Sequence, residues 1–210
     1  MGVCAGFAAK SAAADNPNMP TVVIDAGHGG IDNGVQGINS KTDEADINLA
    51  VARLLRAQFA GAGFNCVMTR TSEAGLYDDT SKGFKMRDMK KRKQIIEESG
   101  ADMVISVHQN FCPLPSVRGG IVFYDKSSDE GAALAESIQS ELNALPQCVK
   151  PGEAKVGDYY MLKCTESPSV IVECGFLSNA AEDELLNTDE YRRAVAYAIF
   201  KGAVSYFANR

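Results

Sequence analysis

The chain has 210 residues, 45% of them hydrophobic, and a formal net charge of −6 at pH 7 from 27 acidic and 21 basic side chains. This apolar content is enough for one medium-sized domain with a core of its own. The acidic balance argues against a nucleic-acid partner, because phosphate binding needs a concentrated basic face. No apolar run approaches the roughly 18 residues of a membrane span, so we expect no span in the body of the chain.

The N-terminal segment is rich in alanine and then in asparagine and proline. It resembles the end of a secretory signal without its basic start, and Ser11–Ala14 would suit a small-residue cleavage site. We interpret residues 1–19 as a leader remnant or disordered tail, and residues 20–210 as one folded domain. The leader interpretation implies export, whereas the alternative is an ordinary flexible tail.

Short β-branched segments alternate with longer helical patterns along the rest of the chain. This alternation predicts a single α/β domain, phosphorylase-like or hydrolase-like, with a mostly parallel, twisted central sheet of about six strands and helices on both faces. The expected strands are 21–25, 65–69, 103–107, 120–124, 160–162 and 169–174. The expected helices are 46–60, 87–99, 129–143 and 189–207. Segments 73–84 and 145–158 are expected to be loops that line a binding site, or else tolerated insertions.

A basic stretch, Lys82–Lys93, is the exception to the acidic composition. Apolar residues interrupt this stretch and acidic residues follow it, a pattern typical of the solvated face of a helix. The alternative is a patch that attracts an anionic polymer.

Both histidines of the chain lie at the end of a strand-like run. His28 follows the first expected strand in a glycine-rich turn, and His108 follows the third. The carboxyl ends of parallel strands are where α/β folds place their ligands, and neutral imidazole is a ready zinc ligand. The pair therefore suggests a metal site, although each histidine could instead cap its strand by hydrogen bonding.

A catalytic zinc ion needs about three protein ligands and one open position, so a third ligand is expected beside the histidines. Glu44 is favoured because it directly precedes an expected helix, whose dipole would keep the carboxylate ionised. Its alternative role is only to complement the helix start. The carboxylates considered for this position are Asp25, Asp32, Asp43, Glu44, Asp46 and Glu173.

Glu173 stands at the end of the apolar strand that runs through Pro168–Gly175. Acidic side chains are rarely buried unless they are paired or functional. A glutamate beside a zinc-bound water would serve amide hydrolysis as general base and then general acid. The alternative is a buried salt bridge to an arginine. Asp25 and Asn110 are further candidates, for orienting the ligands.

Six cysteines are many for an exported protein unless some are paired, and their even number permits pairing. No two of them are spaced as Cys-x-x-Cys, which argues against a structural thiolate zinc site. If one disulfide forms, we expect it between Cys148 and Cys164, which flank an expected loop.

Five motifs of one enzyme family occur here in order. They are Asp25–Gly30 (DAGHGG), Glu44–Leu49 (EADINL), Met68–Arg70 (MTR), Ile105–Asn110 (ISVHQN) and Val172–Asn179 (VECGFLSN). Over residues 21–207 the chain resembles the zinc-dependent N-acetylmuramoyl-L-alanine amidases, also called the amidase type 3 family. Five motifs in this order are specific evidence for the resemblance, whereas Gly-His-Gly-Gly alone would be weak evidence.

The resemblance implies zinc-dependent hydrolysis of the amide that joins muramic acid to L-alanine in peptidoglycan, and it makes residues 20–210 the amidase catalytic domain. On the matching positions His28, Glu44 and His108 resemble the zinc ligands, and Glu173 resembles the catalytic glutamate. Gly119–Tyr124 (GGIVFY) resembles the lineage of spore-forming bacteria that trims cortex peptidoglycan. The implied location is the cell envelope, periplasm-like or the spore intermembrane space, or the outside of the cell.

Two other functions stay open at this point. One is a cell-wall binding module that keeps the scaffold but no longer cuts, although the chain keeps all four proposed groups. The other is a zinc carboxypeptidase or sugar deacetylase, which would share the ligand chemistry. The resemblance also leaves open whether an activating protein partner is required.

Overall fold

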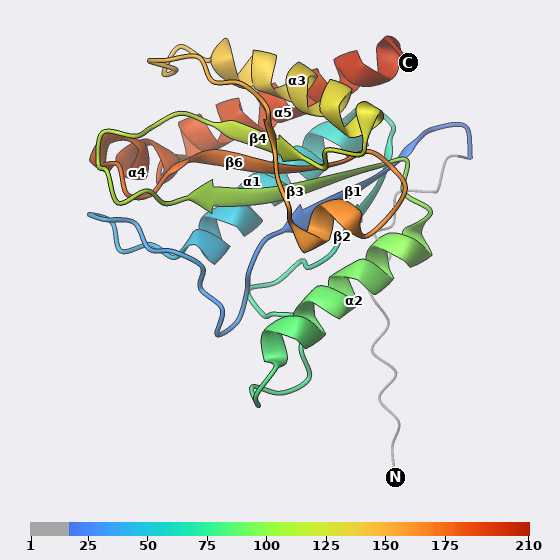
Figure 1. Cartoon of the computed structure of the whole chain (residues 1–210), viewed down its shortest axis with the longest axis horizontal. Coiled ribbons are helices and arrows are strands. Elements are labelled where there is room, and N and C mark those ends of the chain that lie inside the picture. Colours follow the sequence, from blue (N-terminus) through green and yellow to red (C-terminus); the bar gives the residue numbers. More distant parts are fainter. Residues whose placement is uncertain (1–16) are drawn as a thin grey trace.

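Six strands form one central sheet in the computed structural model, which describes residues 17–210 (Figure 1). The order across the sheet is β2-β1-β3-β6-β4-β5, and every neighbouring pair is parallel except β4 with β6. The bounds are β1 Thr21–Ala26, β2 Asn65–Met68, β3 Met103–Asn110, β4 Ile121–Tyr124, β5 Lys155–Val156 and β6 Ser169–Phe176. The mostly parallel six-stranded sheet is therefore confirmed. The leader or tail expected over residues 1–19 lies, as far as residue 16, outside the described residues.

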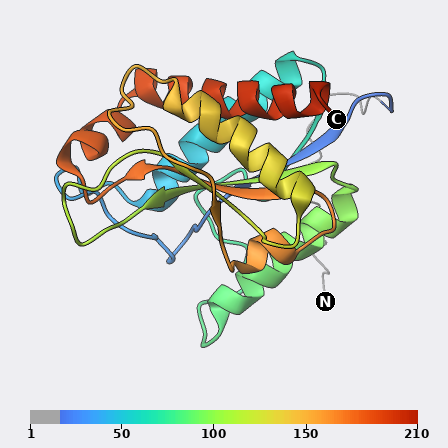
Figure 2. The ribbon, with the colours of Figure 1, turned by 45° about the horizontal axis from the view of Figure 1, so that its top comes forward.

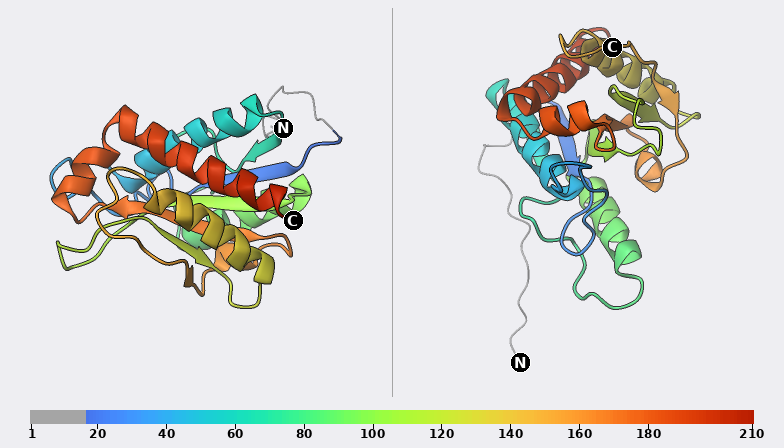
Figure 3. Two further views of the ribbon diagram at one scale, coloured as in Figure 1. Left: turned by 90° about the horizontal axis from the view of Figure 1, so that it is seen from above. Right: turned by 90° about the vertical axis from the view of Figure 1, so that its left-hand side faces the viewer.

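Helices cover both faces of this sheet, as expected. Helices α1, α3 and α5 pack together over one face, and α2 lies on the other (Figures 2 and 3). The bounds are α1 Glu44–Gly61, α2 Phe84–Ser99, α3 Asp129–Asn143, α4 Ala180–Leu186 and α5 Asp189–Ala208. None of the helices within residues 17–210 combines the length and the apolar character that a membrane crossing needs.

The larger core lies between the sheet and helices α1, α3 and α5. Side chains alternate across each strand, so Val22 and Ile24 of β1 point into this core while Val23 points to the other face. On that other face, Val23 joins a smaller cluster that includes Ile96 of α2 and Met161. This second face carries the site described below.

Two expectations about the elements were wrong. Residues 160–162 do not form a strand but begin a 3₁₀ helix, η1 (Tyr160–Lys163). Met161 and Leu162 are both buried, which breaks the in-and-out alternation of a strand, and the Leu162 amide donates to the Tyr159 carbonyl one turn back. The sixth strand is instead β5, an exposed edge of two residues inside a segment expected to be a loop.

Helix α4 was not expected either. It has only 7 residues, too few for an apolar periodicity to emerge, and the Asn179 side chain caps it by accepting a hydrogen bond from the Glu182 amide. The predicted Cys148–Cys164 disulfide is also wrong, since both thiols are free. Cys164 is buried in the small cluster on the α2 face, whereas Cys148 follows α3 on the opposite face.

Candidate active site

Four predicted site residues gather at the carboxyl edge of the sheet. His28 lies in the turn after β1, His108 lies near the end of β3, and Glu44 is the first residue of α1. Glu173 of β6 is the register partner of His108. Neighbouring strands lie about 4.8 Å apart, so this register keeps His108 and Glu173 side by side.

Three of these side chains offer a nitrogen or oxygen atom to one point. The Nε2 atom of His28 lies 3.3 Å from Oε1 of Glu44, and Nδ1 of His108 lies 3.0 Å from the same oxygen. One donor atom from each of the three residues lies within 4.8 Å of the others. The imidazole rings meet edge to face with their centroids 5.0 Å apart. The predicted trio therefore forms a compact N,N,O donor set.

Glu44 is a buried anion inside this set, with 3% of its surface exposed. Burial opposes its ionisation, but the imidazoles of His108 and His28 outweigh that effect and lower its pKa. Backbone amides of Val35 and Gln109 also donate to its oxygens. Among the described residues no lysine or arginine pairs with Glu44. When both imidazoles are neutral, a bound cation would supply the counter-charge to Glu44, and the site therefore fits a metal.

The turn that carries His28 is tightly constrained. His28 has a φ of 61°, in the left-handed region that side chains other than glycine rarely adopt. A Cβ atom on Gly27 would lie 2.2 Å from the His108 ring, so only glycine lets the two elements approach this closely. A strained backbone of this kind persists only where the surrounding structure enforces it, and such positions are often found at functional sites.

Two buried arginines hold the carbonyls of this turn. Arg70, which follows β2, donates to the carbonyl oxygens of Ala26 and Gly27, each at 2.9 Å. Arg92 of α2 donates to the His28 carbonyl at 2.6 Å. These contacts fix the direction in which the His28 side chain leaves the backbone.

Asp25 does not join the donor set, although it was one of the candidate ligands. It pairs with Arg92 at 2.6 Å and also accepts hydrogen bonds from Thr69 and Ser106. Burial raises the pKa of Asp25, but Arg92 and the two hydroxyls outweigh it and lower the value to about 2. Asp25 is thus linked to His28 by Arg92, which donates to both residues. Asn110, the other candidate for orienting the ligands, accepts a hydrogen bond from the Phe111 amide.

Asp32 is the carboxylate that orients His28. Its Oδ2 lies 3.1 Å from Nδ1 of His28, and its Oδ1 lies 2.7 Å from the Lys85 ammonium. A carboxylate on Nδ1 leaves Nε2 free to act as a ligand. The sequence had placed Asp32 only among possible third ligands; its position four residues after His28 in a glycine turn gave no sign of this contact. Asp43 and Asp46 lie outside the donor set.

Replacing Asp32 by asparagine is expected to weaken metal binding by about 10- to 100-fold, as for other partners of metal-bound histidines. The amide keeps the shape but loses the charge that favours the Nδ1–H form of His28. Competition with a chromophoric chelator would measure the affinity. Asp43→Asn, on an exposed contact to Gln36, is the control, and equal affinities in the two variants would contradict this role.

Glu173 is the unpaired member of the site. Its Oε2 atom is buried without a hydrogen-bond partner among the described residues, and no arginine pairs with it. The alternative of a structural salt bridge is therefore wrong. Burial raises the pKa of Glu173 to about 7. A carboxyl poised near neutral pH suits proton transfer in both directions.

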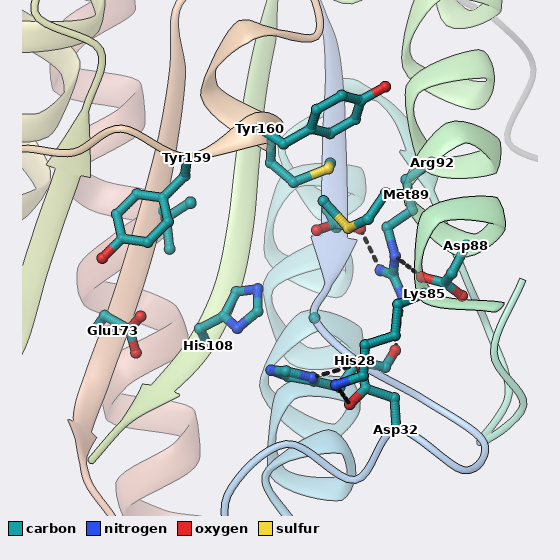
Figure 4. A pocket seen from close by; sticks show the side chains of 14 residues that line it. His28, Asp32, Lys85, Asp88, Met89, Arg92, His108, Tyr159, Tyr160 and Glu173 are labelled. Carbon is teal, nitrogen blue, oxygen red and sulfur yellow. Dashed lines mark hydrogen bonds and ion pairs between the residues drawn. The ribbon is translucent and has the colours of Figure 1, made fainter. Parts of the chain in front are cut away.

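A cavity of about 370 Å³ opens between the donor set, α2 and η1 (Figure 4). Lys85, Met89 and Arg92 contribute from α2, and Tyr159, Tyr160 and Met161 contribute from the other wall. The two segments expected to line a site do not supply lining residues. Segment 73–84 acts indirectly, because the Tyr77 hydroxyl accepts from the Ile31 amide at 2.6 Å and so supports the His28 turn.

Two imidazoles and a carboxylate lie beside a free buried carboxyl, and His28, His108 and Glu173 all line one cavity. This arrangement fits the site of a metal-dependent hydrolase. Comparison with known proteins agrees with this class. Residues 22–205 match the family described as N-acetylmuramoyl-L-alanine amidase. The chain belongs to this amidase family.

Individual relatives are similar over nearly the whole chain. The germination-specific N-acetylmuramoyl-L-alanine amidase of Bacillus subtilis is 32% identical over 192 residues, which cover 90% of this chain and 80% of the relative. The CwlD amidase of Clostridioides difficile, solved in complex with the GerS lipoprotein, has a TM-score of 0.87 and 36% identity, covering 91% of this chain and 100% of that one. The catalytic domain of CwlV from Bacillus (Paenibacillus) polymyxa has a TM-score of 0.79 and 27% identity, covering 91% of this chain and 100% of that domain.

Proposed function

We propose that residues 20–210 form a zinc-dependent catalytic domain that hydrolyses the amide between N-acetylmuramic acid and L-alanine in peptidoglycan. His28, Glu44 and His108 hold the ion, and Glu173 is the catalytic glutamate. The observation that carries the proposal is the convergence of three donor atoms within 4.8 Å beside a buried carboxyl that has no partner. The family membership of the chain selects the amide among the bonds that such a site can cut.

The donor set suits zinc better than the hard cations. Two imidazole nitrogens and one carboxylate oxygen are typical catalytic zinc ligands and leave one coordination position open, whereas magnesium and calcium prefer oxygen ligands throughout. When bound, zinc would polarise the scissile carbonyl and make water more acidic.

Side chains of the protein supply the proton transfer, the positioning of His28 and the binding of the substrate. Glu173 takes a proton from the attacking water and passes it to the departing alanine nitrogen. Asp32 and the Arg92 contact to the His28 carbonyl keep the His28 ring in place. The walls formed by α2 and η1 hold the substrate and exclude water from the reacting bond.

The proposal extends to spore cortex as the substrate and to the cell envelope or the outside of the cell as the location. The germination-specific relative in Bacillus subtilis and the similarity to CwlD support it. CwlD was solved with a lipoprotein, and we propose that this chain also works with an activating protein partner.

Removing the metal is expected to abolish release of L-alanine amino groups from purified peptidoglycan, and adding zinc back is expected to restore it. Spore cortex and vegetative peptidoglycan should be digested side by side, with cortex cut faster. Mass spectrometry of the products locates the cleaved bond. Cleavage elsewhere in the stem or sugar would identify a carboxypeptidase or deacetylase instead, and zinc binding without cleavage would indicate a binding module.

A further inference from the structure

Few of the side chains that line the cavity beside the donor set offer a positive charge to a ligand. Its lining includes the carboxylates of Asp25, Asp32 and Asp88, and only two cationic residues, Lys85 and Arg92, among the residues that line it. Arg92 is 1% exposed and already donates to Asp88, Asp25 and the His28 carbonyl. An incoming anion therefore finds one available cation on this wall, Lys85.

Lys85 is accessible, and its ammonium points to a carboxylate of the site. Its side chain is 65% exposed, and its ammonium lies 2.7 Å from Oδ1 of Asp32. Asp32 is in turn anchored by His28 through its other oxygen. An ammonium has three N–H donors, and Asp32 is its single ion-pair partner among the described residues. Figure 4 shows the Lys85 side chain descending from α2 toward Asp32 and His28.

The opposite end of the cavity offers no comparable partner for an anion. Met89 and the ring of Tyr160 lie there (Figure 4). Met161 adds a further apolar side chain to the cavity lining. Burying a carboxylate against such a surface is costly. Among the side chains that line the cavity, the available positive charge thus lies at one end, beside His28.

We infer that Lys85 is a specificity-determining residue that binds a carboxylate of the peptide stem on the alanine side of the scissile amide. The inference rests on the proposed function, because it assumes that the substrate is a peptide stem. Two carboxylates have the right chemistry: the free α-carboxylate of a γ-linked glutamate that follows the alanine, and the carboxylate at the end of the stem. An exposed ion pair such as Lys85–Asp32 contributes little free energy. The Lys85 ammonium can therefore contact a substrate carboxylate at a small cost in free energy.

The test measures binding rather than turnover, in zinc-loaded protein that carries Glu173→Gln. Three synthetic muramoyl tripeptides are compared by calorimetry: one with both carboxylates free, one with the glutamate α-carboxamide, and one with the terminal carboxamide. Adding Lys85→Met is expected to weaken binding of the first peptide about tenfold, as for loss of one charge-assisted hydrogen bond. The same substitution is expected to leave unchanged the Kd of the peptide in which the contacted carboxylate is amidated.

Lys90→Met is the matched control, because Lys90 is exposed on the same helix and does not line the cavity. Lys85→Arg is expected to restore most of the affinity, since it keeps the charge. An equal loss for all three peptides, or no loss for any, would overturn the inference. If the peptides bind in this pattern but the wild-type protein cleaves them at another bond, the proposed function fails while the role of Lys85 stands.

Discussion

Glu173→Gln is expected to lower turnover on peptidoglycan by a factor of about 100 or more, in line with the usual contribution of a general acid and base. The amide is isosteric with the carboxyl but cannot accept the proton of the attacking water. Oε2 of Glu173 has no partner to lose, so the fold and the zinc content are expected to stay unchanged. Release of free amino groups gives the rate, and metal analysis gives the zinc content.

Glu153→Gln is a suitable control, because Glu153 is exposed and lies outside the cavity lining. It is expected to keep wild-type turnover. Near wild-type activity in Glu173→Gln would remove Glu173 from the reaction. Loss of zinc together with loss of activity would instead make Glu173 a metal ligand.

Arg92→Met is expected to lower the free energy of unfolding by about 3–5 kcal/mol, because it leaves buried carboxylates without their partner. Arg92 is 1% exposed and lies 2.6 Å from both Asp25 and Asp88. Methionine fills part of the volume but cannot compensate either charge. Urea denaturation followed by circular dichroism measures the loss.

Arg87→Met on the same helix provides the comparison. Its partner Asp79 is exposed, with 64% of its side-chain surface accessible, so a far smaller loss is expected. A similar small loss in Arg92→Met would show that the buried cluster contributes little to stability. Arg92→Met is also expected to weaken metal binding, since the His28 carbonyl loses its guanidinium donor.

The convergence of the site was predictable because the sheet is parallel. Strand ends that are far apart in sequence meet at one edge, so the sequence alone predicts that His28, His108 and Glu173 lie together. Glu44 was selected by its position at a helix start, and α1 does begin there. These predictions depend on the periodicity of long elements, which tertiary packing reinforces.

The features that were missed depend on packing between distant segments. The distance along the chain between Lys85 and Asp32 gives no sign that α2 brings them to 2.7 Å. The wall that contains Tyr159 and Tyr160 was hidden because a 3₁₀ turn of apolar residues resembles a short strand. The prediction of a Cys148–Cys164 disulfide was wrong because sequence spacing does not reveal on which side of the sheet each cysteine lies.

The two histidines of the donor set are attached to the fold in different ways. His108 is fastened to a paired strand, whereas His28 sits on a turn whose carbonyls accept hydrogen bonds from two guanidinium groups. Substitutions that remove these guanidinium contacts would therefore release the His28 side of the donor set first, while His108 stays fixed by its strand. The geometry of the donor set thus depends on the β1 turn as much as on the sheet.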